Sequence, residues 1–236
     1  MALALVAFSP VPVSLAGESA GDDAEHRPLP LEEAHIEALR EGGYLLFLRH
    51  GERELGIPAM ELIDLAEHVP GVDKPPDDMP GHCLTEAGKE SAKILGQLFA
   101  KLDIPIGAVY SSPICRAVQT ARLAFDRVDE RVEVLSFVHH NYGDEADIER
   151  HGKRLRQFFR EQLRADSNVV MSAHGNMLRP LAVEYDDLEE LGFLIFDSDL
   201  KLVARANPGE LAALIYSLEV PGDATRDMPG KADTAQ

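Results

Sequence analysis

Residues 44–52 read YLLFLRHGE, an apolar run that ends abruptly in charged and polar residues. A continuous run such as Tyr44 to Leu48 is typical of a strand that is buried on both faces of a sheet. His50 follows at the carboxyl end of this strand, and Gly51 allows a tight turn and a close approach of a ligand to the backbone. The stretch therefore predicts a central strand of an α/β sheet, with an imidazole at the edge where such sheets bind ligands.

The same pattern recurs further along the chain, where the apolar run Val169 to Ser172 is followed by His174 and Gly175. The carboxyl ends of parallel strands meet at one edge of a sheet, so residues that follow two such strands lie near each other. We therefore expect His50 and His174 to share one site.

Strand and helix patterns alternate through most of the chain. Helical spacing of apolar residues predicts helices at residues 31–40, 85–102, 113–125, 145–163 and 177–183. Short apolar runs predict strands at residues 44–48, 108–110, 132–135, 169–172, 193–196 and 202–206. This alternation favours a mostly parallel central sheet with helices on both faces, a three-layer α/β/α sandwich. We expect one such domain over residues 42–220.

The composition is that of an ordinary globular protein, because its 236 residues are 45% hydrophobic and 27% charged and include only 2 Cys. Disorder of the whole chain and a disulfide-dense small scaffold are thereby excluded. The formal net charge of −18 repels polyanions, so nucleic acids and anionic membrane surfaces are not expected partners. An anion site in this protein has to build its own local positive charge.

Arginines supply positive charge near the predicted site. Arg49 directly precedes His50, Arg53 follows soon after it, and Arg116 stands at the start of the predicted helix 113–125. A guanidinium at a helix start can bind a phosphate through two hydrogen bonds, and the free N–H groups of the helix N-terminus add to the attraction. Positive groups at several strand ends of an acidic protein predict a pocket for a small phosphorylated substrate.

The N-terminal residues Met1–Ala16 carry no charge and end in SLA, which fits the small-x-small pattern of a signal-peptidase site. The run is short and interrupted by Pro10 and Pro12, so it is poorly suited to span a bilayer as a helix. We therefore predict a signal peptide and a periplasmic or secreted protein without a membrane span. An apolar tail on a cytoplasmic protein is the alternative.

Three further segments complete the predicted organisation. Residues 17–41 predict a polar linker followed by the short helix at 31–40. Proline and glycine recur in residues 57–82, which predicts a long loop over one end of the fold. Residues 221–236 are expected to form a disordered tail. The sequence carries no signal for an oligomeric state.

Four motifs, in the order of the chain, resemble the histidine phosphatase superfamily, whose members include phosphoglycerate mutase-like enzymes and acid phosphatases. The motifs are Arg49-His50-Gly51-Glu52, Leu84-Thr85-Glu86-Ala87-Gly88, Ser111-Ser112-Pro113 with Arg116-Ala117-Val118-Gln119-Thr120-Ala121, and Ser172-Ala173-His174-Gly175. One RHG triplet is weak evidence, whereas four ordered motifs at predicted strand ends are strong. The resemblance covers roughly residues 42–207.

The resemblance implies that His50 is the nucleophile and becomes phosphorylated, and that no metal and no other cofactor is needed. It further implies a substrate-binding set made of Arg49, Gly51, Arg53, Arg116, His174 and Gly175. The predicted function is a metal-independent phosphomonoester hydrolase that acts through a phosphohistidine intermediate. A phosphomutase of the same superfamily and a catalytically silent phosphate-binding or interaction protein are the alternatives.

The sequence departs from the family pattern at the proton donor. Phe137 stands where the phosphoglycerate mutase-like branch places a glutamate, and Asn176 stands where the acid phosphatase branch places an aspartate. We predict Glu145 as the residue that takes the role of the acid. The other candidates are Asp144, Glu52, His139 and His140. A leaving group that departs easily needs less protonation, so the missing acid leaves the substrate class open.

The two cysteines, Cys83 and Cys115, allow two interpretations. In a cytosolic enzyme both are expected to be reduced, whereas in an exported protein two thiols that can meet are usually bridged. The resemblance includes exported relatives with cysteines at both matching places, which favours a disulfide between Cys83 and Cys115.

Overall fold

The computed structural model of the protein describes residues 29–54, 83–136, 144–183 and 186–219. The predicted signal peptide Met1–Ala16, the loop 57–82, the tail 221–236 and the pair His139 and His140 lie outside these ranges. Within them, no helix has the length and apolar character needed to cross a bilayer.

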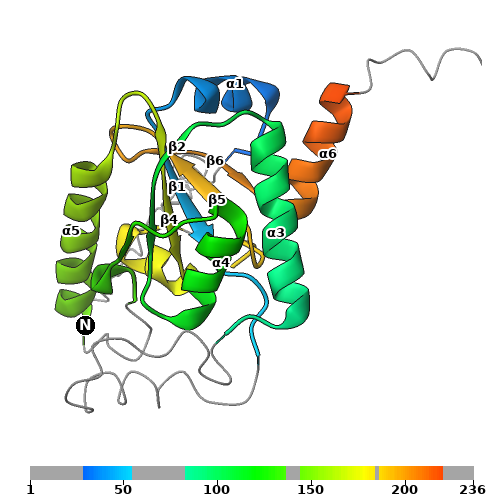
Figure 1. The fold of residues 1–236 in the computed structure, drawn as a ribbon. Helices are drawn as coiled ribbons and strands as arrows, with labels where there is room; N and C mark the ends of the chain where they lie inside the picture. Colours follow the sequence, from blue (N-terminus) through cyan, green and yellow to red (C-terminus); the bar gives the residue numbers. More distant parts are fainter. Residues whose placement is uncertain (1–28, 55–82, 137–143, 184–185, 220–236) are drawn as a thin grey trace, which may run out of the picture.

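The fold is built on a six-stranded sheet with the strand order β3-β2-β4-β1-β5-β6 (Figure 1). The strands are β1 (Leu45–Arg49), β2 (Ile106–Ser111), β3 (Glu130–Arg131), β4 (Asn168–Ala173), β5 (Phe193–Phe196) and β6 (Leu202–Ala206). The pairs β1/β4, β2/β4 and β2/β3 are parallel, and β5 is antiparallel to both β1 and β6. The predicted mostly parallel sheet is thereby confirmed.

Helices cover both faces of the sheet (Figure 1). One face packs against α1 (Glu33–Glu41), α3 (Glu86–Lys101), α4 (Cys115–Phe125) and α6 (Pro208–Glu219). The other face packs against α5 (Glu145–Gln162) and the 3₁₀ segments η1 (Glu133–Leu135) and η3 (Gly175–Leu181). This is the predicted three-layer α/β/α arrangement.

Strand β1 explains why a continuous apolar run is needed at the centre. Leu46 and Leu48 belong to the core on the α3 side, while Leu45 and Phe47 belong to the core on the α5 side. Successive side chains of a strand point to opposite faces, so a strand covered on both sides must be apolar at every position.

Two predicted elements were wrong in type. Residues 132–135 do not form a strand, because β3 ends at Arg131 and Leu135 donates to the carbonyl of Val132 at 3.0 Å, which closes the 3₁₀ turn η1. The alternation of valine and glutamate there resembles a strand, yet Leu135 is fully buried in the core beside α5. The predicted helix 177–183 is instead the 3₁₀ helix η3, which contains Pro180 and therefore lacks one of the N–H donors that an α-helix uses.

Candidate active site

The register of the sheet brings the two strand-end histidines together. Arg49 of β1 lies opposite Ala173 of β4, so the next residue of each strand, His50 and His174, leaves the sheet at the same edge. The amide of His50 donates to the carbonyl of Ala173 at 3.0 Å. The imidazole centroids are 5.2 Å apart with an angle of 61° between the rings, and both side chains are buried. The expected shared site is present.

His50 is held as a neutral imidazole with a defined tautomer. Its Nδ1 lies 2.8 Å from the carbonyl oxygen of Gly51, and a carbonyl can only accept, so Nδ1 carries the proton. Burial first, then Arg116 and the more distant arginines, lowers the pKa of His50 to about 3, although the Gly51 hydrogen bond opposes this shift. At neutral pH the Nε2 atom therefore has a free lone pair and can act as a nucleophile.

His174 is also neutral, for a related reason. Burial first, and then the positive charge of Arg116, holds its pKa well below the usual range. Its Nε2 atom lies 2.9 Å from the hydroxyl of Ser112, whereas its buried Nδ1 atom has no hydrogen-bond partner in the described part of the chain. Ser112 is held in turn by its amide, which donates to the carbonyl of Ser172 at 2.8 Å.

Arg116 is the strongest anion-binding feature of the site. It is the second residue of α4 and is only 5% exposed, and burial lowers its pKa to about 10, so the guanidinium stays charged at neutral pH. Its buried Nε has no partner, and no carboxylate pairs with it within the described ranges. A buried charge without a counter-ion is costly, so this guanidinium is a candidate to bind an anion.

Arg49 and Arg53 add positive charge around the histidines. Arg49 is half-buried at the end of β1 and donates to the carbonyl of Leu188. Arg53 is half-buried as well, and its charge contributes to the lowered pKa values of His50, His174 and Arg116. Both charges thus act on the two imidazoles, and the substrate-binding roles of Arg49 and Arg53 stay predictions.

Gly51 and Gly175 lie directly beside the two imidazoles, and both are buried. A Cβ atom on Gly51 would lie 3.2 Å from Leu191 Cδ2 and 3.3 Å from the carbonyl oxygen of Gly88, so the loop after β1 leaves little room for a side chain. Gly175 is the first residue of η3. The substrate-binding roles of Gly51 and Gly175 stay predictions.

Two hydroxyl residues of the site were not singled out from the sequence, although both stand within its motifs. Ser112 contacts His174, as described above. Thr120, on α4, accepts a hydrogen bond from the amide of Gly51 at 3.0 Å and donates to the carbonyl of Arg116 at 2.8 Å. This buried hydroxyl joins the loop that carries His50 to the turn that carries Arg116. The spacing of four residues between Arg116 and Thr120 on a predicted helix was the available signal.

The candidate acids occupy less central positions. Glu145 begins α5, is exposed, and lies 3.7 Å from the guanidinium of Arg179. Asp144 caps the same helix by accepting from the amide of Asp147 at 2.9 Å. Glu52 accepts from the hydroxyl of Thr85 at 3.1 Å. None of these described carboxylates makes a hydrogen bond or ion pair with either imidazole, and the role of Glu145 as the acid stays a prediction.

The structure pairs Cys83 with Cys115 in a disulfide, with a Cα–Cα distance of 4.9 Å across a sequence separation of 32. Cys115 is the first residue of α4, directly before Arg116. The bridge therefore connects the segment in front of α3 to the turn that carries the buried guanidinium.

Over the described ranges, no group of three or more His, Cys, Asp or Glu side chains is placed to hold a metal ion.

The chain is similar to several known proteins. Among solved structures, the chain is similar to a phosphoserine phosphatase from Entamoeba histolytica, at 17% identity and a TM-score of 0.48 over 71% of this chain and 98% of that one. It is also similar to the open reading frame Rv3214 from Mycobacterium tuberculosis, at 18% identity and a TM-score of 0.46 over 68% and 95% of the two chains.

A curated relative, agropine synthesis reductase from Rhizobium rhizogenes, is 30% identical over 154 residues, which are 58% of this chain. The chain spans only 34% of the length of that relative. The family model of the histidine phosphatase superfamily (branch 1) matches residues 45–144, a range that begins at β1 and holds three of the four motifs, including His50 and Arg116. This match agrees with the motifs and with the arrangement of the strand ends: residues 45–144 of the chain resemble the histidine phosphatase superfamily (branch 1).

Proposed function

We propose that this protein is a metal-independent phosphomonoester hydrolase that forms a phosphohistidine on His50. The observation that carries the proposal is the buried, charged Arg116 without a carboxylate partner in the described chain, next to two neutral imidazoles. The unpaired Nε of Arg116 and the unpaired Nδ1 of His174 are groups that phosphoryl oxygens can satisfy.

In the first half-reaction, the lone pair of His50 Nε2 attacks phosphorus and the bond from phosphorus to the ester oxygen breaks. The departing oxygen leaves with the electron pair of that bond and takes a proton from an acid or from water. Arg116 and the neighbouring arginines stabilise the negative charge on the equatorial oxygens. Because Nδ1 keeps its proton, the phosphorylated ring is cationic, and the Gly51 carbonyl stabilises it through the existing hydrogen bond.

In the second half-reaction, water attacks phosphorus and the bond between phosphorus and Nε2 breaks. The electron pair of that bond returns to Nε2, so His50 leaves as the neutral tautomer with which the cycle began. One proton of the water passes to solvent or to the released phosphate. The same neutral form that makes His50 a nucleophile thus makes it a good leaving group.

The site favours substrates whose leaving group departs without strong protonation. No described carboxylate contacts the imidazoles, so acyl phosphates, phosphoramidates and aryl phosphates are better suited than alkyl phosphates. We propose a small phosphorylated substrate of this kind, because the arginines near the two imidazoles supply local positive charge in a chain with a net charge of −18.

The test is hydrolysis of p-nitrophenyl phosphate and acetyl phosphate in the presence of EDTA. The native protein should release inorganic phosphate, and His50→Ala should lose this activity while keeping its fold, because the covalent step is gone. His35→Ala, a histidine change on α1, is the matched control and should keep full activity. A base-stable, acid-labile phosphoryl label on the native protein but not on His50→Ala would identify the intermediate.

Three results would contradict the proposal. The folded native protein could fail to turn over any phosphate, which would favour a silent binding protein. Phosphoryl transfer to a second hydroxyl without release of phosphate would favour the phosphomutase. Activity lost in EDTA and restored by one divalent ion would show a metal-dependent mechanism.

A further inference from the structure

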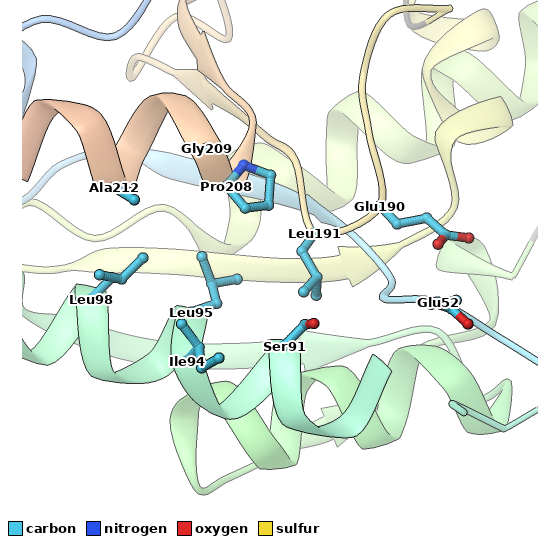
Figure 2. Close-up of a pocket in the computed structure, with 10 residues that line it drawn as sticks. All are labelled: Glu52, Ser91, Ile94, Leu95, Leu98, Glu190, Leu191, Pro208, Gly209 and Ala212. Atoms are coloured by element: carbon cyan, nitrogen blue, oxygen red, sulfur yellow. The ribbon is translucent and has the colours of Figure 1, made fainter. Parts of the chain in front are cut away.

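A groove with a volume of about 420 Å³ lies between α3 and α6, on the face of the sheet that these helices cover (Figure 2). His50, His174 and Arg116 do not line it. Its walls are apolar, with Ile94, Leu95 and Leu98 from α3 and Ala212 from α6. Cavities of this size are typical of sites for small organic ligands.

The two helices that form the groove, α3 and α6, carry exposed apolar side chains. Ile94 is 48% exposed, and Tyr216, one turn beyond Ala212 on α6, is 68% exposed. The residues of α6 that are buried are Leu211 and Ile215, although most of this helix is apolar. Exposed apolar side chains beside an apolar groove favour a ligand or partner that covers them.

The groove is acidic at one end and apolar towards the other. Figure 2 places the carboxylates of Glu52 and Glu190 at one end, with the leucines of α3 towards the other. None of the described lining residues is basic. Glu52 accepts one hydrogen bond, from Thr85, which leaves most of its acceptor capacity available.

We propose that this groove binds a small organic cation with an apolar chain and a primary ammonium group. The apolar walls take the chain, and the two carboxylates at the end of the groove take the ammonium, which is protonated at neutral pH as a lysine side chain is. The net charge of −18 also attracts cations over long range and repels carboxylate or phosphate ligands. A groove of this volume favours a free amine over a folded protein partner, whose interface would bury far more surface.

Leu191, which lines the groove, can report on the binding of a ligand. Leu191 lies between the apolar walls and the carboxylates, and its amide donates to the carbonyls of Arg49 and His50 at 3.2 and 3.3 Å. A ligand in the groove therefore touches a side chain whose methyl groups are observable by NMR, without entering the phosphate site.

Hexylamine, hexan-1-ol and hexanoate are the matched probes, because they share one apolar chain and differ in the charge of the head group. Titration of the full chain with isotope-labelled Ile and Leu methyl groups should shift Ile94, Leu95 and Leu191 saturably. Hexylamine should bind at least about threefold more tightly than hexan-1-ol, as expected for a partly exposed ion pair. Hexanoate should bind most weakly, because its carboxylate is repelled by the two glutamates.

Two pairs of variants locate the binding. Glu190→Gln should weaken hexylamine binding about threefold and leave hexan-1-ol unchanged, whereas Glu189→Gln at the exposed neighbouring position should change neither. Ala212→Phe should fill the groove and abolish binding of both probes. Ala213→Phe, also exposed on α6 but outside the groove, should not.

The proposal is overturned by the absence of saturable shifts, by equal binding of all three probes, or by tighter binding of hexanoate. Binding that survives Ala212→Phe would place the amine elsewhere, and preference for a lysine-containing peptide over hexylamine would assign the groove to a protein partner. Because the readout is binding and not turnover, the result is independent of the proposed phosphatase activity.

Discussion

At His50, burial and the surrounding arginines lower the pKa, and only the Gly51 carbonyl opposes them. The pKa is about 3 in the folded protein and 6.5 for the unperturbed group, so between these values the unfolded chain binds a proton that the folded one does not. The stability that the neutral imidazole contributes is therefore fully present above about pH 6.5 and is lost as the pH falls towards 3.

We expect the free energy of unfolding to fall on acidification from pH 7 to pH 5 more steeply for the native protein than for His50→Asn. The difference should approach about 1.4 kcal/mol per pH unit below the unfolded pKa, since one proton is involved. Urea unfolding at a series of pH values measures it. His174→Asn should behave in the same direction, and parallel curves for all three proteins would contradict the prediction.

Thr120 carries a second prediction at the residue scale. Its hydroxyl accepts from Gly51 and donates to Arg116, so Thr120→Val leaves a buried N–H without a partner while keeping the side-chain shape. We expect turnover of p-nitrophenyl phosphate to fall about tenfold or more, because the His50 loop is no longer fixed relative to Arg116. Thr120→Ser keeps the hydroxyl and should restore most of the activity. Equal losses in both variants would show that the loss of activity does not come from the missing hydroxyl.

At the scale of elements, the start of α4 is fixed from several sides. Cys115 is bonded to Cys83, and the side chain of Gln119 accepts from the amide of Leu84 at 2.8 Å. The loop from β1 is joined to the same helix through Thr120. The turn that carries Arg116 is thus tied to the start of α3 and to the end of β1.

Reduction of the disulfide should lower the free energy of unfolding by about 4 kcal/mol, as the chain-entropy argument gives for a loop of this length. The measurement is urea unfolding with and without a reductant, and Cys83→Ala with Cys115→Ala is the matched variant, which should not respond to reductant. Thiol titration of denatured, unreduced protein from an oxidising compartment tests the bridge directly. Two free thiols there would defeat the disulfide and weaken the argument for export.

At the scale of the whole molecule, a net charge of −18 surrounds a site built from arginines. Raising the ionic strength from about 0.01 M to about 0.15 M shortens the screening length from about 30 Å to about 8 Å, which weakens the distant negative charges more than the contacts inside the site. We expect kcat/KM for p-nitrophenyl phosphate to rise with salt, by about twofold, and kcat to change little. A fall in kcat/KM would show that the local arginines dominate the encounter.

Much of the fold and the first outline of the site follow from local sequence. The uninterrupted apolar run at β1 predicts a strand covered on both faces, because alternate side chains must each find a core. Histidine followed by glycine at the ends of β1 and β4 predicts their meeting, since parallel strands finish at one edge. Arg116 could be placed near them because it opens a helix after a third strand.

Only the tertiary structure decided the features that depend on contacts between distant segments. Residues 132–135 alternate like a strand, yet burial of Leu135 in the core beside α5 turns them into η1. The tautomer of His50 is set by the Gly51 carbonyl, which lies beside Nδ1. The roles of Thr120 and Ser112 depend on contacts with Gly51 and His174, which lie far from them in the sequence. The groove between α3 and α6 likewise exists only once both helices pack on the sheet. Local sequence determines which elements form and at which edge charges gather, whereas hydrogen bonds and cavities are set by packing between residues far apart in the chain.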